Sequence, residues 1–224
     1  MRRGARRAMA PLAAALLAVA PLGGGCARPG YDHGLFRAHL PRSILVLPPL
    51  SESVDVDAPY VFLATVTRPV AEAGYYVFPV GVVDALMKEN GLPTPGEMHQ
   101  VSLGKLREVF GADAVLYVTI EEWGQRYRVL DSSTIVRARA ALVETGTAAT
   151  IWEGEIEGVE SSAAGQSDLI GMLIAALIEQ VVDTLNDRTY DLSRLATWRT
   201  VFDEEDGFLR GPRHPDFEAD ARGR

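Results

Sequence analysis

Two segments in the second half of the chain alternate between charged and apolar side chains. Residues 134–143 read TIVRARAALV, and residues 150–160 read TIWEGEIEGVE. Successive side chains of a β-strand point to opposite faces, so each segment predicts a strand with one polar and one apolar face. Because the interval between them is short, the two segments predict an antiparallel hairpin with one solvated face.

The charged positions also predict a register for this hairpin. If the loop around residues 145–147 leaves an odd number of residues unpaired, Arg139 faces Glu153 and Arg137 faces Glu155. All of these charges then lie on one face of the sheet. Such a row is typical of a solvated face, where each pair contributes ~0.2 to 1 kcal/mol, and we do not interpret it as a substrate site.

A third strand is predicted just before the hairpin. Residues 112–123 read ADAVLYVTIEEW and are rich in side chains that favour strands. Gly124 predicts a bulge through which the strand continues, and residues 131–133 (DSS) predict the following turn. On a regular strand Glu121 and Glu122 point to opposite faces, so we do not expect their carboxylates to share a substrate.

The first half of the chain predicts a parallel crossover. Residues 43–49 read SILVLPP, a buried strand closed by two prolines. A helix is expected from about Pro59, with a kink at Pro69 and an end at Gly74. Residues 75–80 (YYVFPV) predict the next strand. Strand, helix and strand in this order favour a right-handed β-α-β unit.

Two further amphipathic helices are predicted between the two halves. The first ends at Gly91, a suitable C-terminal cap, and the second begins at the N-cap residue Ser102 and ends before Gly111. The sequence therefore predicts an α/β fold with a single mixed sheet of about five strands. The sheet is parallel in the β-α-β first half and antiparallel in the hairpins of the second half, with helices packed on it.

The first 25 residues have the layout of a secretory signal peptide. The basic run MRRGARR is followed by AMAPLAAALLAVAPLGGG, which contains no charge. Pro11 and Pro21 interrupt the apolar run, which is short of the ~20 residues that a membrane-spanning helix needs. We therefore expect residues 1–25 to be removed and residues 26–40 to act as a tether before a domain over residues 41–190.

Cys26 is the single cysteine of the chain, and it follows Gly24 and Gly25. A small-residue stretch that ends at a cysteine is similar to a bacterial lipoprotein signal, which predicts that Cys26 carries lipid. The third position before the cysteine is Gly23, where such signals usually have leucine. The alternative is an ordinary signal peptide that is cleaved nearby and leaves a free thiol, which is a liability in an oxidising compartment.

Composition excludes several classes of function. The formal net charge is −8, and a chain that begins at Cys26 carries −12 because four arginines precede it. Binding to nucleic acid needs a basic surface, so we expect no nucleic acid partner. One cysteine cannot form an internal disulfide, and four scattered histidines predict no Cys/His metal cluster. We expect no metal and no cofactor.

The segment at residues 169–178 is apolar around its whole circumference as a helix, but ten residues are too short to span a bilayer. One interpretation is a helix packed in the core. The other is a surface for a partner or for self-association into a homo-oligomer. The candidate residues for such a surface are Leu169, Ile170, Leu173, Ile174 and Leu177.

The C-terminal region is charged and rich in glycine and proline. Residues 191–224 are interpreted as an extension of the domain, which is predicted to be disordered from about residue 203.

One catalytic spacing was considered. Ser102 and Lys105 match the S-x-x-K spacing of penicillin-recognising hydrolases, but the accompanying S-D-N and K-T-G elements are absent from the sequence. Ser102 is sufficiently explained as an N-cap. A serine hydrolase is therefore the most remote alternative, and we predict no catalytic residue.

The segments PRSILVLPPLSESVDVDAPYVFLATVTRPVAEAGYYVFPVGVVDALMKENGLPTP and LREVFGADAVLYVTIEEWGQRY resemble a family of outer-membrane lipoproteins of Gram-negative bacteria. The family is known as a domain of unknown function and includes a meningococcal antigen candidate. The resemblance covers about residues 41–190 and implies a fold similar to the N-terminal domain of the translocation protein TolB. It carries no established catalytic residues.

The resemblance also implies a location and a class of partner. In such lipoproteins Asp at the second position after the lipidated cysteine favours the inner membrane, and this chain has Arg28 there. We therefore expect attachment to the outer membrane on its periplasmic side. Genes of the family often accompany a gene for a curli-secretion-like lipoprotein. These implications favour a non-enzymatic protein-binding module in envelope assembly or secretion, with a self-associating structural subunit as the alternative.

Overall fold

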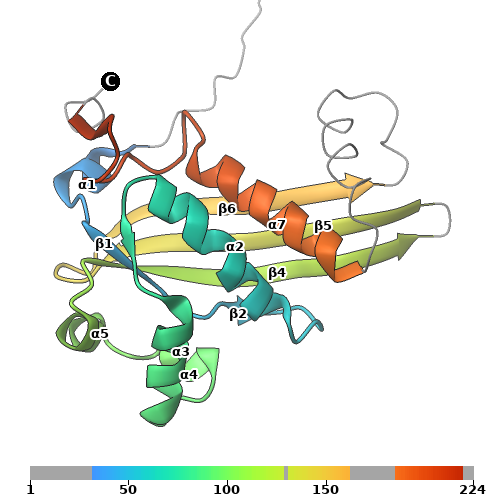
Figure 1. Ribbon diagram of the computed structural model, residues 1–224, viewed down its shortest axis with the longest axis horizontal. Coiled ribbons are helices and arrows are strands. Elements are labelled where there is room, and N and C mark those ends of the chain that lie inside the picture. Colours follow the sequence, from blue (N-terminus) through green and yellow to red (C-terminus); the bar gives the residue numbers. More distant parts are fainter. Residues whose placement is uncertain (1–31, 129–130, 162–184, 219–224) are drawn as a thin grey trace, which may run out of the picture.

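The computed structural model describes residues 32–128, 131–161 and 185–218. The described residues form a mixed α/β fold around one open sheet (Figure 1). Six strands make up the sheet: β1 (Ser43–Val46), β2 (Leu50–Ser51), β3 (Tyr76–Val77), β4 (Ala114–Arg128), β5 (Asp131–Glu144) and β6 (Thr150–Ser161). The helices are α1 (Gly34–Ala38), α2 (Ala58–Glu72), α3 (Val80–Glu89), α4 (Pro95–Met98), α5 (Leu103–Phe110) and α7 (Leu185–Val201). The predicted fold class is confirmed.

The first half of the sheet is parallel. The strand order is β3-β1-β4-β5-β6, and β1 runs parallel to both β3 and β4. Strand β2 also pairs in parallel with β4, where Leu50 lies opposite Thr119. Pro48 and Pro49 separate β1 from β2, since neither residue has an N–H to donate. The predicted β-α-β unit is confirmed, and β2 is an additional short strand.

Helix α2 links the parallel strands β1 and β3 through the β2 segment. A proline lies in its first turn, as expected for Pro59, and the helix continues through Pro69 to Glu72. Its buried face includes Phe62, Val66 and Val70. Gly74 follows with a φ of 99°, and a Cβ there would lie 2.6 Å from the backbone nitrogen of His214. Glycine is therefore needed at this end of the helix for both conformation and space.

The caps predicted for α3 and α5 are confirmed. Gly91 has a φ of 83° just after α3, and Gly111 has a φ of 71° at the end of α5. The Ser102 hydroxyl accepts a hydrogen bond from the backbone N–H of Lys105 at 3.3 Å. Glycine has no Cβ and adopts a positive φ without steric cost, so both helices end where the sequence predicts.

The second half of the sheet is antiparallel, but the predicted hairpin register is wrong by two residues. Arg137 lies opposite Glu157, and Arg139 lies opposite Glu155. The turn leaves four residues, 145–148, between the hydrogen-bonded Glu144 and residue 149, rather than an odd number. A one-residue irregularity between Leu142 and Val143 restores the parity, so the charges still share one face.

Two further details of β4 and β5 differ from the sequence-based expectation. The irregularity in β4 lies between Ile120 and Glu122, not at Gly124. Residues 131–133 belong to strand β5, where Asp131 pairs with Arg128, so the predicted DSS turn is wrong. The strands are long enough for cross-strand hydrogen bonds to outweigh the turn preference of these three residues.

Helices cover the two faces of the sheet unequally. Helices α2 and α7 lie across the long strands on one face (Figure 1). That core includes Val46, Leu116, Ile120 and Trp152. On the opposite face Leu45, Leu47 and Val115 pack with side chains from α3, α4 and α5. These three helices cover the part of the sheet at β1 and the beginning of β4.

Both ends of the described chain pack on the domain, which corrects two predictions. Residues from Gly34 form α1 instead of a tether, and Phe36 is fully buried. Residues 203–218 are not disordered: Phe208 is 5% exposed and packs edge-on against Phe36, Tyr75 and Trp152. Burial of one aromatic cluster offsets the ordering cost of both charged segments. The predicted apolar helix at residues 169–178 lies outside the described residues.

Candidate functional site: the charged sheet face

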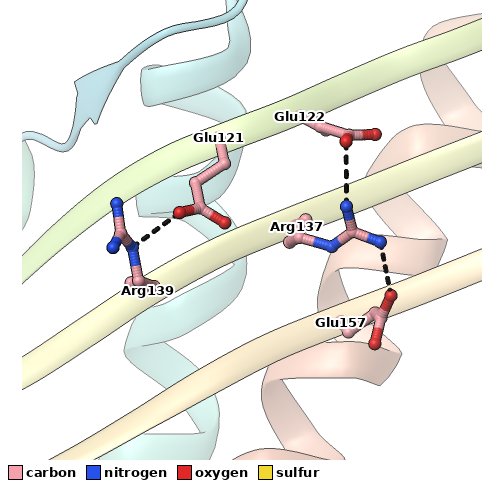
Figure 2. Close-up of polar contacts among 5 residues, drawn as sticks. All are labelled: Glu121, Glu122, Arg137, Arg139 and Glu157. Atoms are coloured by element: carbon pink, nitrogen blue, oxygen red, sulfur yellow. Dashed lines mark hydrogen bonds and ion pairs between the residues drawn. The ribbon is translucent and has the colours of Figure 1, made fainter.

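Strands β4, β5 and β6 present a row of charged side chains on the face opposite α2 and α7. Figure 2 shows these side chains in front of the strands, with the helices behind. Arg137 of β5 bridges the strands on its two sides, β4 and β6. Its Nη1 lies 2.8 Å from Glu122 of β4, and its Nη2 lies 2.7 Å from Glu157 of β6. The Nε of Arg139 lies 2.6 Å from Glu121. The row therefore joins three strands through side-chain ion pairs.

A β-bulge places Glu121 and Glu122 on the same face. Ile120 pairs with Ala138 and Glu122 pairs with Arg137, so Glu121 is the extra residue of β4. The expectation that the two carboxylates point to opposite faces is wrong, because it assumed a regular strand. Both carboxylates contact arginines of β5, as Figure 2 shows.

The ion pairs of Arg137 favour its charged form. The pKa of Arg137 is raised, first by the hydrogen bond to Glu157 and then by the charges of Glu122 and Glu157. The side chains of the row are partly exposed, from 26% for Glu121 to 62% for Arg139. Solvent screening makes such pairs weak contributors to stability. They therefore determine the charge and shape of this face of the sheet more than the free energy of folding.

A groove of about 800 Å³ runs along β6 at the edge of this face, and we call it the β6 groove. Tyr117, Thr119 and Ala141 line it from β4 and β5. Its charged lining residues are Arg139, Glu153, Glu155, Glu157, Arg199, Asp203 and Asp206. Five carboxylates against two guanidinium groups give the groove a net negative charge.

The C-terminal end of α7 and the segment after it form one side of this groove. The Thr200 hydroxyl donates a hydrogen bond to the backbone carbonyl of Glu155 at 3.1 Å. The Trp152 indole N–H donates to the backbone carbonyl of Asp206 at 2.7 Å. These bonds fix Asp203 and Asp206 beside β6, although they are far from it in sequence. Sequence reasoning missed both residues because it treated their segment as disordered.

A histidine and a tyrosine meet where α4 approaches the charged face. His99 Nε2 lies 2.9 Å from the backbone carbonyl of Pro48, and its ring packs edge-on against Tyr117, with centroids 5.2 Å apart. Burial lowers the pKa of His99, and burial raises the pKa of Tyr117. Both shifts favour the neutral forms, so this corner of the groove adds no charge to it.

The S-x-x-K pair has other contacts. Ser102 caps α5 through the Lys105 backbone N–H, and the Lys105 ammonium lies 3.1 Å from Glu108. The Lys105 side chain is 57% exposed. The two side chains therefore act as a helix cap and a surface ion pair, which accounts for both residues without catalysis.

Other predicted site residues lie outside the described part of the chain. These are Cys26 and the apolar candidates Leu169, Ile170, Leu173, Ile174 and Leu177. Within residues 32–128, 131–161 and 185–218, no group of three His, Cys, Asp or Glu side chains is arranged to hold a metal ion. None of the helices described in these ranges combines the length and the apolar character needed to cross a bilayer.

Comparison with known proteins identifies the family. A family model described as "Putative lipoprotein GNA1162-like" matches residues 31–213. The Neisseria meningitidis serogroup B protein "Putative lipoprotein NMB1124/NMB1162" is 41% identical over 186 residues, which cover 83% of this chain and 86% of that protein. The crystal structure of lipoprotein GNA1162 from Neisseria meningitidis matches with 44% identity and a TM-score of 0.53, covering 64% of this chain and 100% of that chain. The protein therefore belongs to the GNA1162-like lipoprotein family.

Proposed function

We propose that this lipoprotein is a non-enzymatic module of the outer membrane that faces the periplasm and binds protein partners in envelope assembly or secretion. Family membership supports membrane attachment through lipid, and Cys26 is the single cysteine that could carry it. One acyl chain gives only marginal attachment, whereas the two or three chains of a bacterial lipoprotein would hold the protein firmly. Arg28 in place of Asp after the cysteine favours the outer membrane.

The observation that carries the binding role is the charged sheet face with its groove. The long strands β4 to β6 pack their apolar side against α2 and α7, while the other side presents ion pairs and the β6 groove. A surface of this kind suits a protein partner, because charged groups around a groove give specificity and speed of association. A curli-secretion-like lipoprotein is one partner that we propose to test.

A second candidate is a self-associating subunit of an envelope complex. The apolar segment at residues 169–178 favours it, since ten consecutive residues of this kind offer more apolar area than a surface usually exposes. Light scattering of the mature protein in detergent tests this candidate. An oligomer that dissociates in a folded Leu173→Asp variant supports it, and a strict monomer rejects it.

The anchor and the binding role are tested together on protein from native membranes. Intact mass should show a mature chain that begins at Cys26 and carries lipid, and Cys26→Ser should abolish the added mass. Affinity purification after mild solubilisation should then recover the same envelope protein in repeated preparations. Repeated purification without any protein partner would reject the binding role, and cleavage elsewhere with a free thiol would reject the anchor.

A further inference from the structure

We propose that the β6 groove binds a lysine- or arginine-rich segment of a protein partner. This inference rests on the proposed binding role and specifies the chemistry of the partner.

Negative charge is concentrated along β6 and on the facing side of the groove. Glu153, Glu155 and Glu157 alternate along β6, and all three are exposed. Asp203 and Asp206 add two carboxylates from the other side of the groove. Glu157 is neutralised by Arg137, whereas the carboxylate of Glu155 has no such ion pair in the described part of the chain. A cationic segment would therefore meet a lining of five carboxylates and two guanidinium groups, which is negative overall.

Two hollows of the described surface differ in the charge of their lining residues. A second hollow of about 290 Å³ lies between α2 and α7, and its charged lining residues are Arg68 and Arg194. Charge complementarity thus distinguishes the two hollows. Arg68 and Arg194 are each paired with a neighbouring carboxylate, whereas the lining of the β6 groove has an excess of carboxylates, so a partner with exposed lysine or arginine is directed to the β6 groove.

The shape of the lining suits long cationic side chains. Ala141 is a short side chain between Tyr117 of β4 and Glu153 of β6, and Thr119 is a second short side chain beside Tyr117 on β4. Lysine and arginine carry long apolar stems below a charged head. Such stems can lie over the short side chains and the Tyr117 ring while the heads reach the carboxylates of β6.

The charges of the edge strand β6 disfavour a second copy of this chain at the same edge. In the described ladders β6 pairs with β5 alone, so its other side is the edge of the sheet. Two β6 strands paired antiparallel about Glu155 would place Glu155 opposite Glu155 and Glu153 opposite Glu157. Like charges directly opposite each other are destabilising, and charged edge strands disfavour self-pairing.

The test measures binding of a defined peptide to the full mature lipoprotein in detergent micelles. The probe is a fluorescent 12-residue peptide that alternates lysine with threonine, and its lysine-to-glutamate counterpart serves as the charge control. The wild-type protein should bind only the lysine peptide, with an affinity that falls as salt is raised. In the variant Glu153→Gln/Glu155→Gln we expect at least ~threefold weaker binding, which corresponds to two modest surface pairs.

A matched variant separates the groove from general acidity. Glu52→Gln/Glu89→Gln removes the same charge at two exposed positions that do not line the groove and should bind the peptide like the wild type. Equal binding by all three proteins, or no binding to the wild type, would overturn the inference. If a partner recovered from membranes is retained equally by both variants, the binding role stands and the groove assignment fails. If wild-type protein recovers no partner, the binding role itself fails.

Discussion

Glu121 and Arg139 form an ion pair across β4 and β5, although Glu121 has no partner of its own in the strand ladder. Ile120 and Glu122 pair with the consecutive residues Ala138 and Arg137, so the ladder would be regular without Glu121. The bulge thus adds one carboxylate to the charged face without changing which side chains point to the core.

This relationship predicts that a deletion in the middle of a long strand is tolerated. Deleting Glu121 leaves Ile120 and Trp123 facing the core and removes only a partly exposed ion pair, so the free energy of unfolding should change by about 1 kcal/mol or less. Deleting Thr119 instead shifts the pairing by one residue and should prevent folding or cost several kcal/mol. Denaturant unfolding of both variants measures the difference. Equal losses would show that the bulge is not a simple insertion.

The C-terminal segment is predicted to be part of the folded core. Phe208 is 5% exposed and contacts Phe36, Tyr75 and Trp152, so Phe208→Ala should destabilise the protein by about 3 to 5 kcal/mol. Glu204→Ala, at an exposed position of the same segment, should change stability by less than ~0.5 kcal/mol. Thermal unfolding provides the comparison. Two variants with wild-type stability would mean that residues 203–218 do not support the fold.

Close packing between β6 and α7 leads to a glycine prediction. A Cβ at Gly158 would lie 2.8 Å from Cγ of the buried Leu192, so Gly158→Ala should destabilise the protein by about 1 to 3 kcal/mol. Gly104 lies in α5 with open space around it, and Gly104→Ala should stabilise by ~0.5 to 1 kcal/mol. Chemical denaturation distinguishes the two. A stabilising effect at Gly158 would contradict the described packing of α7.

Stability should fall in mildly acidic solution partly through His99. Burial lowers its pKa in the folded protein from the ordinary value of 6.5. Below pH 6.5 the unfolded chain therefore binds a proton at His99 more readily than the folded protein does. The contribution of neutral His99 to the free energy of unfolding is fully present above pH 6.5 and is lost as pH falls from there through the folded pKa. His99→Gln should flatten this part of the stability profile. An NMR titration that gives His99 a pKa above 6.5 would contradict the sign.

Local structure could be predicted from the sequence where one residue decides it. Ser102, Gly91 and Gly111 determine helix ends by their own chemistry, and the alternation around Arg137 and Arg139 determines which face of the sheet is charged. These features depend on neighbours within a few residues along the chain.

The features that the sequence did not predict depend on two irregularities that offset each other, or on contacts between residues distant in sequence. A four-residue turn and a one-residue irregularity near Leu142 act together, so the pairing of Arg137 with Glu157 could not be read from either alone. Phe208 lies in a charged segment, and contacts with residues distant in sequence, such as Phe36 and Trp152, order that segment. The β6 groove needs the ordered segment, so the sequence could predict its glutamates but not the groove itself.

Site-specific photo-crosslinking in the native envelope tests the central claim most directly. A benzophenone amino acid replaces Thr119, an uncharged lining residue of the β6 groove, in one strain and Glu89, an exposed residue outside the groove, in another. The account predicts an adduct between position 119 and a lysine- or arginine-rich segment of one envelope protein, and no such adduct from position 89. Absence of an adduct at 119 while the protein is folded and membrane-bound, or the same adducts at both positions, would contradict it.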